Sequence, residues 1–403
     1  MSNPEHKGRS RESLEKANRL AAEGRFDEAL RYYDQATKID PKVAFSWYGK
    51  GRVSTELGRF DEALRYFDEA IKLDPRYHRT WTSKGLVLTR LAAIEEALKC
   101  YEEAIRLDPW DPEPLYEKGL ALAARGRFHD AIECFDEVLA LDPRNANALH
   151  GKGRAFESLG RIQDAVELYD EALKIDASCG QTWNSRGVAL NKLGRIVEAL
   201  ESFDKATKTD RKLSEAWYNK GTVLATLGRF AEAIECFDEA TKISPRNADA
   251  WNGRGLALIS LGNFDDAVDD FGEAIKIDPK NIWAWNSRGV AYFHLGKAEE
   301  AIRCYDRATA IDPKSADTWY NKGFALHELG RFEEAAECYN QALAINPGHA
   351  DAWNARGLTL YMLGKYEDAV SCYSEAIRIN PSLAQAREGK RLAEKKLKRD
   401  TEC

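Results

Sequence analysis

A lysine or arginine recurs every 34 residues along the sequence, and such a row of cations could contact a phosphate backbone. We number each repeat from the residue equivalent to Ser214, which places these cations at position 7: Lys16, Lys50, Lys84, Lys118, Lys152, Arg186, Lys220, Arg254, Arg288, Lys322 and Arg356. An α-helix turns by about 100° per residue, so position 7 shares a flank with positions 3, 10 and 14 and faces a neighbouring helix. Aspartate is common at position 25 and could pair with these cations. We therefore interpret the row as structural, and nucleic-acid binding is the less favoured alternative.

Cysteine and histidine side chains could form disulfides or bind a metal ion. Six of the eight cysteines occupy position 23 of their repeats: Cys100, Cys134, Cys236, Cys304, Cys338 and Cys372. Cysteines a whole repeat apart exceed the roughly 7 Å Cα separation that a disulfide tolerates, and none forms a C-x-x-C motif. His294 and His327 lie in successive repeats, but no third ligand type stands beside them. We expect free thiols, no metal site and no cofactor.

A third set of residues combines hydrogen-bonding and aromatic side chains at positions 2, 5, 9, 12 and 13, which share one helix face. An asparagine amide can pair with both N–H and C=O of an extended peptide, and exposed aromatic patches mark interaction sites. The candidate partner-binding residues are Asn184, Tyr218, Asn252, Trp283, Asn286, Phe293, His294, Tyr320, Phe324, His327, Asn354 and Tyr361. The alternative is that these Asn and Tyr residues are merely solvated. Acids at position 2 favour a ligand with Lys or Arg, or else only stabilise the helix dipole.

Two helices per repeat must position these groups. Glycine recurs at position 15, which suits the left-handed residue that ends a first helix (helix A) over positions 1–14. A second helix (helix B) follows over positions 18–30 and ends at an Asp-Pro pair. Gly at position 8 and Ala at position 20 are small enough for the two helices to cross closely, beside Trp at position 4 and an aromatic residue at position 24. Repeat 3 carries Ala92 at position 15, so its turn should be strained or differently shaped.

The repeated pattern W-x-x-[KR]-G, followed by A-x-x-x-[FY] and then Pro, resembles the tetratricopeptide repeat, which has the same period of 34 residues. This resemblance implies an all-α fold, a right-handed α-solenoid of about eleven helical hairpins with a C-terminal capping helix. It also implies that the A helices line a concave surface that receives peptide. The family's chaperone-tail binders use a clamp of Lys and Asn residues, of which only the middle Asn is present here, as Asn219 and Asn321. We therefore expect no binding of carboxylate-clamp chaperone tails.

The period fixes the expected domain boundaries. Residues 1–9 should be a disordered N-terminal tail, residues 384–399 a capping helix and residues 400–403 a tail. Polar residues replace apolar ones in that helix where no further helix B would cover them, as the terminal repeat of a solenoid requires. The solenoid itself should span residues 10–383 as eleven repeats: 10–43, 44–77, 78–111, 112–145, 146–179, 180–213, 214–247, 248–281, 282–315, 316–349 and 350–383.

The composition and motifs of the chain disfavour several classes of function. The 403 residues carry a formal net charge of -7 with both signs interspersed, which is unlike a general nucleic-acid or anionic-membrane binder. No apolar leader and no run of 18 apolar residues occurs, so we expect a cytoplasmic protein. The repeats leave no room for a catalytic domain, and no P-loop, H-E-x-x-H or G-x-S-x-G motif is present. The sequence predicts a non-catalytic scaffold that binds a peptide or partner protein in the concave groove. A regulatory or substrate-recruiting subunit of an enzyme complex is the alternative.

Overall fold

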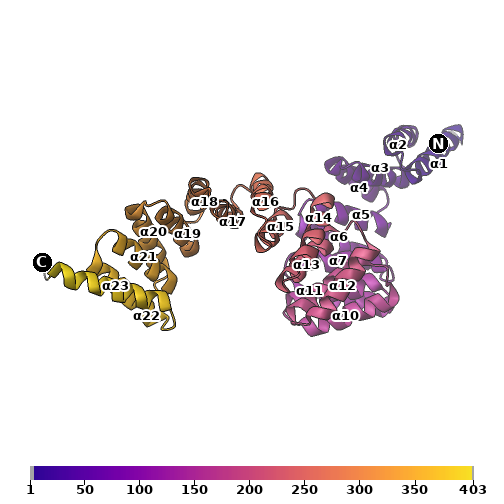
Figure 1. Ribbon diagram of the computed structural model, residues 1–403. Helices are drawn as coiled ribbons and strands as arrows, with labels where there is room; N and C mark the ends of the chain where they lie inside the picture. Colours follow the sequence, from indigo (N-terminus) through magenta and orange to yellow (C-terminus); the bar gives the residue numbers. More distant parts are fainter. Residues whose placement is uncertain (1–3, 402–403) are drawn as a thin grey trace. The chain divides into compact units, whose positions relative to one another are not determined.

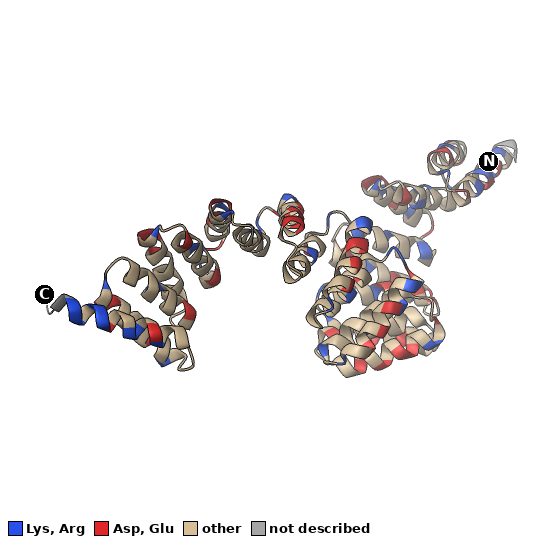
Figure 2. Cartoon of the chain, viewed as in Figure 1, with Lys and Arg blue, Asp and Glu red and all other residues tan. Residues whose placement is uncertain are grey.

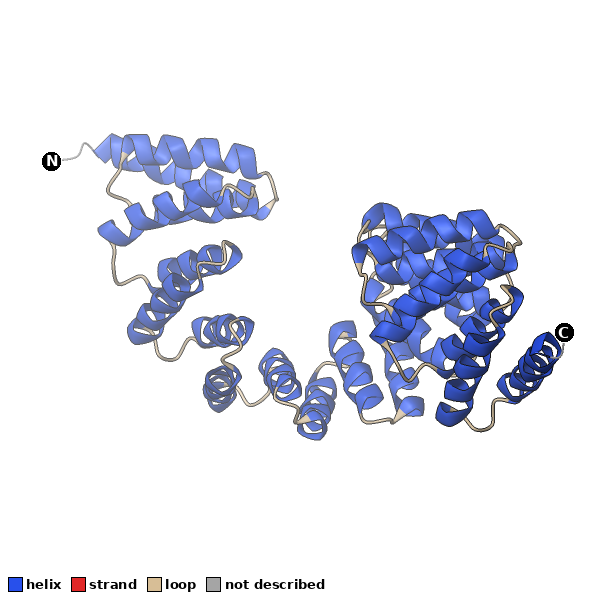
Figure 3. Cartoon of the chain, turned by 90° about the vertical axis from the view of Figure 1, so that its left-hand side faces the viewer, coloured by secondary structure: helices blue, strands red, loops and turns tan. Residues whose placement is uncertain are grey.

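The computed structural model describes the backbone of residues 4–401 and the side chains of residues 8–399. Regular structure in this part of the chain consists of 23 α-helices and no strand (Figure 3). The helices form two compact units, which divide between Thr209 and Asp210. Within each unit, successive helices pack as antiparallel hairpins that follow one another along the chain (Figure 1). The predicted all-α solenoid is confirmed.

Odd-numbered helices up to α21 are the A helices of the repeats, and even-numbered helices are the B helices. Unit 1 contains α1 (Pro4–Ala22), α2 (Phe26–Ile39), α3 (Ala44–Glu56), α4 (Phe60–Leu73), α5 (His78–Arg90), α6 (Ile94–Leu107), α7 (Pro112–Ala124), α8 (Phe128–Leu141), α9 (Ala146–Ser158), α10 (Ile162–Ile175), α11 (Gly180–Lys192) and α12 (Ile196–Thr209). Unit 2 contains α13 (Ser214–Thr226), α14 (Phe230–Ile243), α15 (Ala248–Ser260), α16 (Phe264–Ile277), α17 (Ile282–His294), α18 (Ala298–Ile311), α19 (Ala316–Glu328), α20 (Phe332–Ile345), α21 (Ala350–Met362), α22 (Tyr366–Ile379) and the terminal helix α23 (Ala384–Thr401).

The turn between helices A and B has the same shape in every hairpin. The glycine at position 15 is left-handed in ten repeats, with φ between 72° and 78°. Ala92 adopts the same region in repeat 3, with φ of 59°, and it is the one non-glycine residue with positive φ that the structure describes. A left-handed conformation costs a residue with a Cβ roughly 1–2 kcal/mol. The turn of repeat 3 is therefore strained rather than differently shaped.

Small residues and aromatic rings interlock at the core of each hairpin. A Cβ added at Gly51 would lie 2.4 Å from a ring carbon of Phe67, and one added at Gly187 would lie 2.6 Å from Phe203. Both rings are buried, with at most 1% of their surface exposed. Helices A and B therefore approach closely because position 8 lacks a side chain, and the aromatic residue at position 24 fills the space above it.

The tryptophan at position 4, present in eight of the eleven repeats, links its repeat to the loop before it. Trp47 donates its indole N–H to the carbonyl oxygen of Pro41 over 2.9 Å. The same bond, 2.9 to 3.3 Å long, is made by Trp81, Trp183, Trp217, Trp251, Trp285, Trp319 and Trp353. A non-proline residue supplies the carbonyl in two of these bonds, Ala177 and Arg211. The joint between repeats is thus held by a backbone carbonyl, which any residue can provide.

The two ends of the chain differ from the sequence expectation in length. Residues 4–9, expected to be disordered, belong to helix α1, and residues 1–3 lie outside the described residues. Ser10 explains part of the order, because its buried hydroxyl donates to the carbonyl oxygen of Ala36 over 3.2 Å and ties α1 to α2. At the other end, α23 extends to Thr401, beyond the expected limit of residue 399.

Helix α23 covers the last repeat. Ala386 and Ala393 are fully buried against unit 2, whereas Arg387, Arg391 and Glu394 on its outer face are exposed. No described helix combines the length and the apolar character that a membrane span requires.

Candidate functional site

The position 7 cations lie in the interfaces between helices, as the sequence predicted. Lys50 is only 6% exposed, and its ammonium lies 2.7 Å from the carboxylate of Asp34. Seven such pairs link a helix A to the preceding helix B: Lys50–Asp34, Lys84–Asp68, Lys118–Glu102, Lys152–Asp136, Arg186–Asp170, Arg254–Asp238 and Lys322–Asp306. The structural interpretation is confirmed for these seven cations. Figure 2 shows charges of both signs interleaved along the helices.

Two cations of this row lack the usual carboxylate because the preceding repeat has no acid at position 25. Gly272 stands opposite Arg288, and Asn340 stands opposite Arg356. Arg288 instead places its guanidinium 5.4 Å from the ring centre of Tyr292. The Nε atoms of both arginines are buried without a hydrogen-bond partner among the described residues. Both exceptions lie in unit 2.

The predicted partner-binding residues differ widely in exposure. Asn184 is buried at 5% exposure, so it does not offer an amide to a ligand as expected. Trp283, His294 and Phe324 are exposed. The remaining predicted residues are half-buried: Tyr218, Asn252, Asn286, Phe293, Tyr320, His327, Asn354 and Tyr361.

Aromatic residues from two successive repeats meet in unit 2. The ring of Phe324 in α19 lies 5.3 Å from that of Phe293 in α17 and 6.4 Å from that of Tyr320. Tyr320 also lies 5.0 Å from His349 and 6.0 Å from Tyr339 in the hairpin core. Tyr320 thus belongs partly to the core, whereas Phe324, which is 39% exposed, is the more accessible ring.

The asparagines at position 5 are not equivalent. The side-chain oxygen of Asn286 accepts a 3.2 Å hydrogen bond from the amide of Asn321 in the next repeat. Asn252 turns its side-chain oxygen into the protein, where that atom is buried without a partner among the described residues. Asn354 lines a surface cavity. Of these three, Asn354 is the amide placed beside space that a ligand could fill.

That cavity, which we call the C-terminal groove, has a volume of about 690 Å3. Its walls come from α19 through α23: Tyr320, Phe324, His327, Glu328, Tyr339, Asp351, Asn354, Ala355, Leu358, Tyr373, Ala384, Gln385, Glu388, Gly389 and Leu392. Aromatic and aliphatic side chains share the lining with three carboxylates. None of these lining residues is lysine or arginine. The groove therefore combines apolar surface with negative charge.

Helix α23 supplies a wall of this groove that we did not predict. Gln385, Glu388 and Leu392 line the cavity, although we expected α23 only to shield the last repeat from solvent. These residues occupy positions 2, 5 and 9 of the repeat register continued into α23. Positions 2, 5 and 9 are among the five assigned to the binding face in the preceding helices. Extending the register by one helix would have identified them.

Burial controls ionisation around the groove. Burial lowers the pKa of His327, and its Nδ1 lies 2.9 Å from the hydroxyl of Thr359. Burial also raises the pKa of Tyr320, and the nearby carboxylate of Asp351 adds to the effect. Both side chains are therefore neutral near pH 7, so the carboxylates set the charge of the groove.

The cysteines have the environment of structural thiols. All seven described cysteines are free, and six of them are buried at position 23. Burial raises the pKa of Cys100, Cys134, Cys304 and Cys338 to about 11, so these thiols are protonated near pH 7. No group of three or more His, Cys, Asp or Glu residues that could hold a metal ion occurs in the described part of the chain.

Comparisons with known sequences identify the repeats. Residues 10–183 match the family model described as the C-terminal domain of cilia and flagella-associated protein 70. Tetratricopeptide-repeat models match most of the remaining chain, at residues 218–282, 271–303, 291–330, 316–349 and 350–383. No curated protein matches the sequence.

Solved structures that resemble the chain include the anaphase-promoting complex heterotetramer Cut9–Hcn1, with a TM-score of 0.47 and 16% identity over 94% of this chain and 95% of that one. YrrB, described as a tetratricopeptide-repeat protein with an unusual peptide-binding site, has a TM-score of 0.39 and 25% identity, covering 46% of this chain and 96% of its own. MamA has a TM-score of 0.39 and 28% identity, covering 41% and 96%. The repeated hairpins and the family matches together show that this chain is a tetratricopeptide-repeat protein.

Proposed function

We propose that the protein is a non-catalytic scaffold that binds an extended, basic and apolar segment of a partner protein in the C-terminal groove. The observation that carries this proposal is the composition of the groove, in which aromatic walls and three carboxylates surround about 690 Å3 of space. Ligand sites typically have volumes of about 300–1,000 Å3 and mainly apolar walls with a few polar groups. The C-terminal groove has both properties.

The apolar contacts supply most of the binding free energy in this proposal. Phe324 and Leu358 are 39% and 43% exposed, so a ligand that covers them removes apolar surface from water. Asn354 orients the ligand backbone, at about 0.5–1.5 kcal/mol per hydrogen bond after water is displaced.

The carboxylates decide which ligand enters the C-terminal groove. Glu328, Asp351 and Glu388 come from three different helices, α19, α21 and α23. A ligand with Lys or Arg side chains complements this charge, whereas an acidic ligand would be repelled. Charge therefore determines which ligand binds in the groove, and apolar contacts supply most of the affinity.

A double substitution tests the proposal without disturbing the core. Phe324→Ala with Leu358→Ala removes two exposed side chains from the groove, whereas Tyr320→Ala would also remove a ring that packs on Tyr339. We expect at least a tenfold loss in affinity, about 1.4 kcal/mol, for the partner captured from native extract and identified by mass spectrometry. Isothermal titration calorimetry with the identified segment measures the loss.

The matched control replaces two other exposed leucines of unit 2 that lie outside the groove. Leu227 and Leu261 are 48% and 54% exposed and do not line the cavity. Leu227→Ala with Leu261→Ala should leave affinity unchanged. Equal losses in the two double variants, or normal binding by the groove variant, would show that the partner binds elsewhere.

A further inference from the structure

A second concave site lies in unit 1, at the opposite end of the sequence. Two adjoining cavities of about 260 and 370 Å3 share the lining residues Tyr48, Arg52 and Glu56, all from helix α3. The smaller cavity extends towards α1 and α2, and the larger one extends towards α5 and α7. We call the two cavities together the N-terminal groove. None of the twelve partner-binding residues predicted from sequence lies in it.

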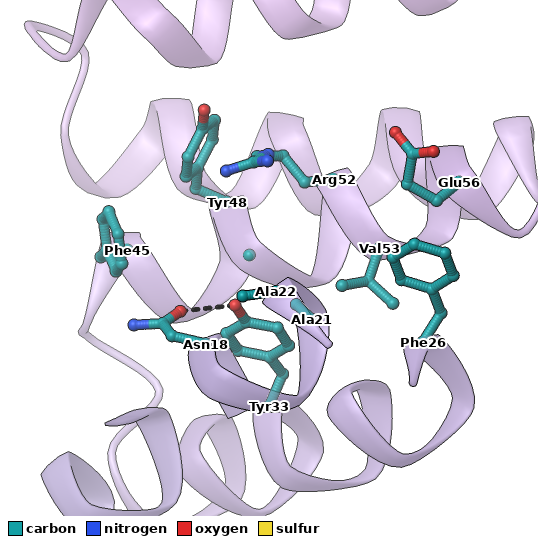
Figure 4. Close-up of a pocket in the computed structure, with 11 residues that line it drawn as sticks. Asn18, Ala21, Ala22, Phe26, Tyr33, Phe45, Tyr48, Arg52, Val53 and Glu56 are labelled. Carbon is teal, nitrogen blue, oxygen red and sulfur yellow. Dashed lines mark hydrogen bonds between the residues drawn. The ribbon is translucent and has the colours of Figure 1, made fainter. Parts of the chain in front are cut away.

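Most of the side chains that line the smaller cavity are apolar or aromatic (Figure 4). Phe26, Phe45 and Val53 line it, and the hydroxyl of Tyr33 donates a 2.5 Å hydrogen bond to the side-chain oxygen of Asn18 at its base. This bond pairs the Tyr33 hydroxyl with the Asn18 side-chain oxygen inside the protein. The space that remains is suited to an apolar side chain of a ligand.

Aromatic contacts hold the wall between the two cavities. The ring of Tyr48 packs edge-on against Tyr77 at 5.3 Å and lies 5.8 Å from Phe45. The guanidinium of Arg52 lies 5.9 Å from the ring centre of Tyr48, towards which it points in Figure 4. The wall therefore presents a positive charge on an aromatic support.

The larger cavity is lined by three arginines, Arg52, Arg79 and Arg90. All three are exposed, and none forms an ion pair with a residue that the structure describes. Some exposed arginines of unit 1 do pair within their own helix turn, as Arg127 does with Asp130. A guanidinium without a carboxylate partner can form a bidentate contact with a carboxylate of a ligand.

We propose that the N-terminal groove binds an acidic segment of a partner protein. An apolar side chain of the segment enters the smaller cavity, and its Asp or Glu carboxylates pair with the arginines of the larger one. Glu56 and Glu113 also line the larger cavity, but the three arginines outnumber them. The site is separate from the C-terminal groove and takes a ligand of opposite charge.

Selection from a random nonapeptide library displayed on phage tests this proposal with the full-length chain. The chain carries Phe324→Ala and Leu358→Ala, so that the C-terminal groove does not dominate the selection. We expect the selected peptides to combine Asp or Glu with a large apolar residue. The best peptide, synthesised with a fluorescent label, should bind less tightly as the NaCl concentration rises, because its carboxylates pair with exposed cations.

Paired substitutions locate the binding. Arg52→Ala with Arg79→Ala should lower the affinity for the labelled peptide at least tenfold. The matched control, Arg65→Ala with Arg76→Ala, removes two exposed arginines of unit 1 that line neither cavity and should have no effect. Circular dichroism should show equal folding of both variants.

Three results would overturn the proposal. The first is a selection without enrichment of acidic residues, and the second is equal binding of the acidic peptide by the Arg52/Arg79 variant. The third is tighter, Arg52-dependent binding of a single-stranded oligonucleotide, which would assign the arginines to phosphate contacts. Failure of this test leaves the proposal for the C-terminal groove unaffected, because that groove uses different residues and is tested by different variants.

Discussion

The N-terminal and C-terminal grooves are built at the same positions of the repeat and carry opposite charge. Position 2 is Arg79 in the N-terminal groove and Asp351 in the C-terminal groove. Position 13 is Arg90 in the first and Glu328 in the second. These positions face away from the hairpin core, so their charge can change without a cost in packing.

The cores beneath the two grooves are nearly identical. The position 24 aromatics Phe67 in unit 1 and Tyr339 in unit 2 are both fully buried, and each packs over a glycine at position 8. One fold thus presents two different surfaces. Specificity in this chain resides in the A-helix face and not in the hairpin that supports it.

Deleting residues 384–403 should have the largest effect on stability, and it should affect the two grooves differently. Without α23, the buried Tyr373 becomes exposed and the C-terminal groove loses one wall. Exposing this ring and its neighbours should destabilise unit 2 by roughly 3 kcal/mol or more. Calorimetry and hydrogen exchange should show the loss in unit 2, while the N-terminal groove keeps its affinity for the acidic peptide. Removal of residues 402–403 alone is the control, and an equally stable deletion variant would contradict α23 as a stabilising wall.

Lowering the pH should have the next largest effect, through a buried histidine of unit 1. Burial lowers the pKa of His150 to about 4, whereas an unfolded histidine titrates near 6.5. The unfolded chain therefore binds the proton first, and stability falls as the pH drops from 6.5 towards 4. Between pH 7 and pH 5 the loss should be about 2 kcal/mol.

Hydrogen exchange around α9 and α11 measures this loss, because Nδ1 of His150 lies 2.9 Å from the hydroxyl of Thr182 in α11. The variant His150→Gln should lose less stability over the same range. A variant that is as sensitive as the native chain would show that another group carries the pH dependence.

Reversing charge in both grooves should exchange their preferences. Glu328→Arg with Asp351→Arg should lower the affinity of the C-terminal groove for a basic ligand at least tenfold, or by about 1.4 kcal/mol. Arg79→Asp with Arg90→Glu should do the same for the acidic peptide in the N-terminal groove. Fluorescence anisotropy with both peptides on all variants gives the full comparison. Charge-reversed grooves with unchanged preferences would mean that shape, and not charge, distinguishes the two sites.

The smallest expected effect comes from restoring glycine at position 15 of repeat 3. Ala92→Gly should stabilise repeat 3 by about 1 kcal/mol, because glycine adopts the left-handed conformation without the cost that alanine bears. The reverse change, Gly126→Ala in the next repeat, should destabilise by a similar amount. Urea denaturation of the two variants provides the measurement, and destabilisation by Ala92→Gly would show that the strain at this turn is offset elsewhere.

The local sequence was sufficient to predict the helical hairpins. Glycine at position 15, proline at position 32 and the small and aromatic residues at positions 8 and 24 act within one or two repeats. Their spacing therefore predicted the helices, the turns and the position 7 ion pairs. The terminal limits were less accurate, because residues 4–9 are ordered as part of α1, which Ser10 ties to Ala36 on another helix.

The grooves could be seen only in the tertiary structure. The twelve predicted residues included Phe324 and Asn354 of the C-terminal groove, but also Asn184, which is buried. The contribution of α23 was not foreseen, and the arginines of the N-terminal groove were not among the predicted partner-binding residues. A periodic sequence specifies which face of a helix a residue occupies, since that depends on the helix alone. Whether space remains above that face depends on the side chains of neighbouring helices, and only their packing in three dimensions determines it.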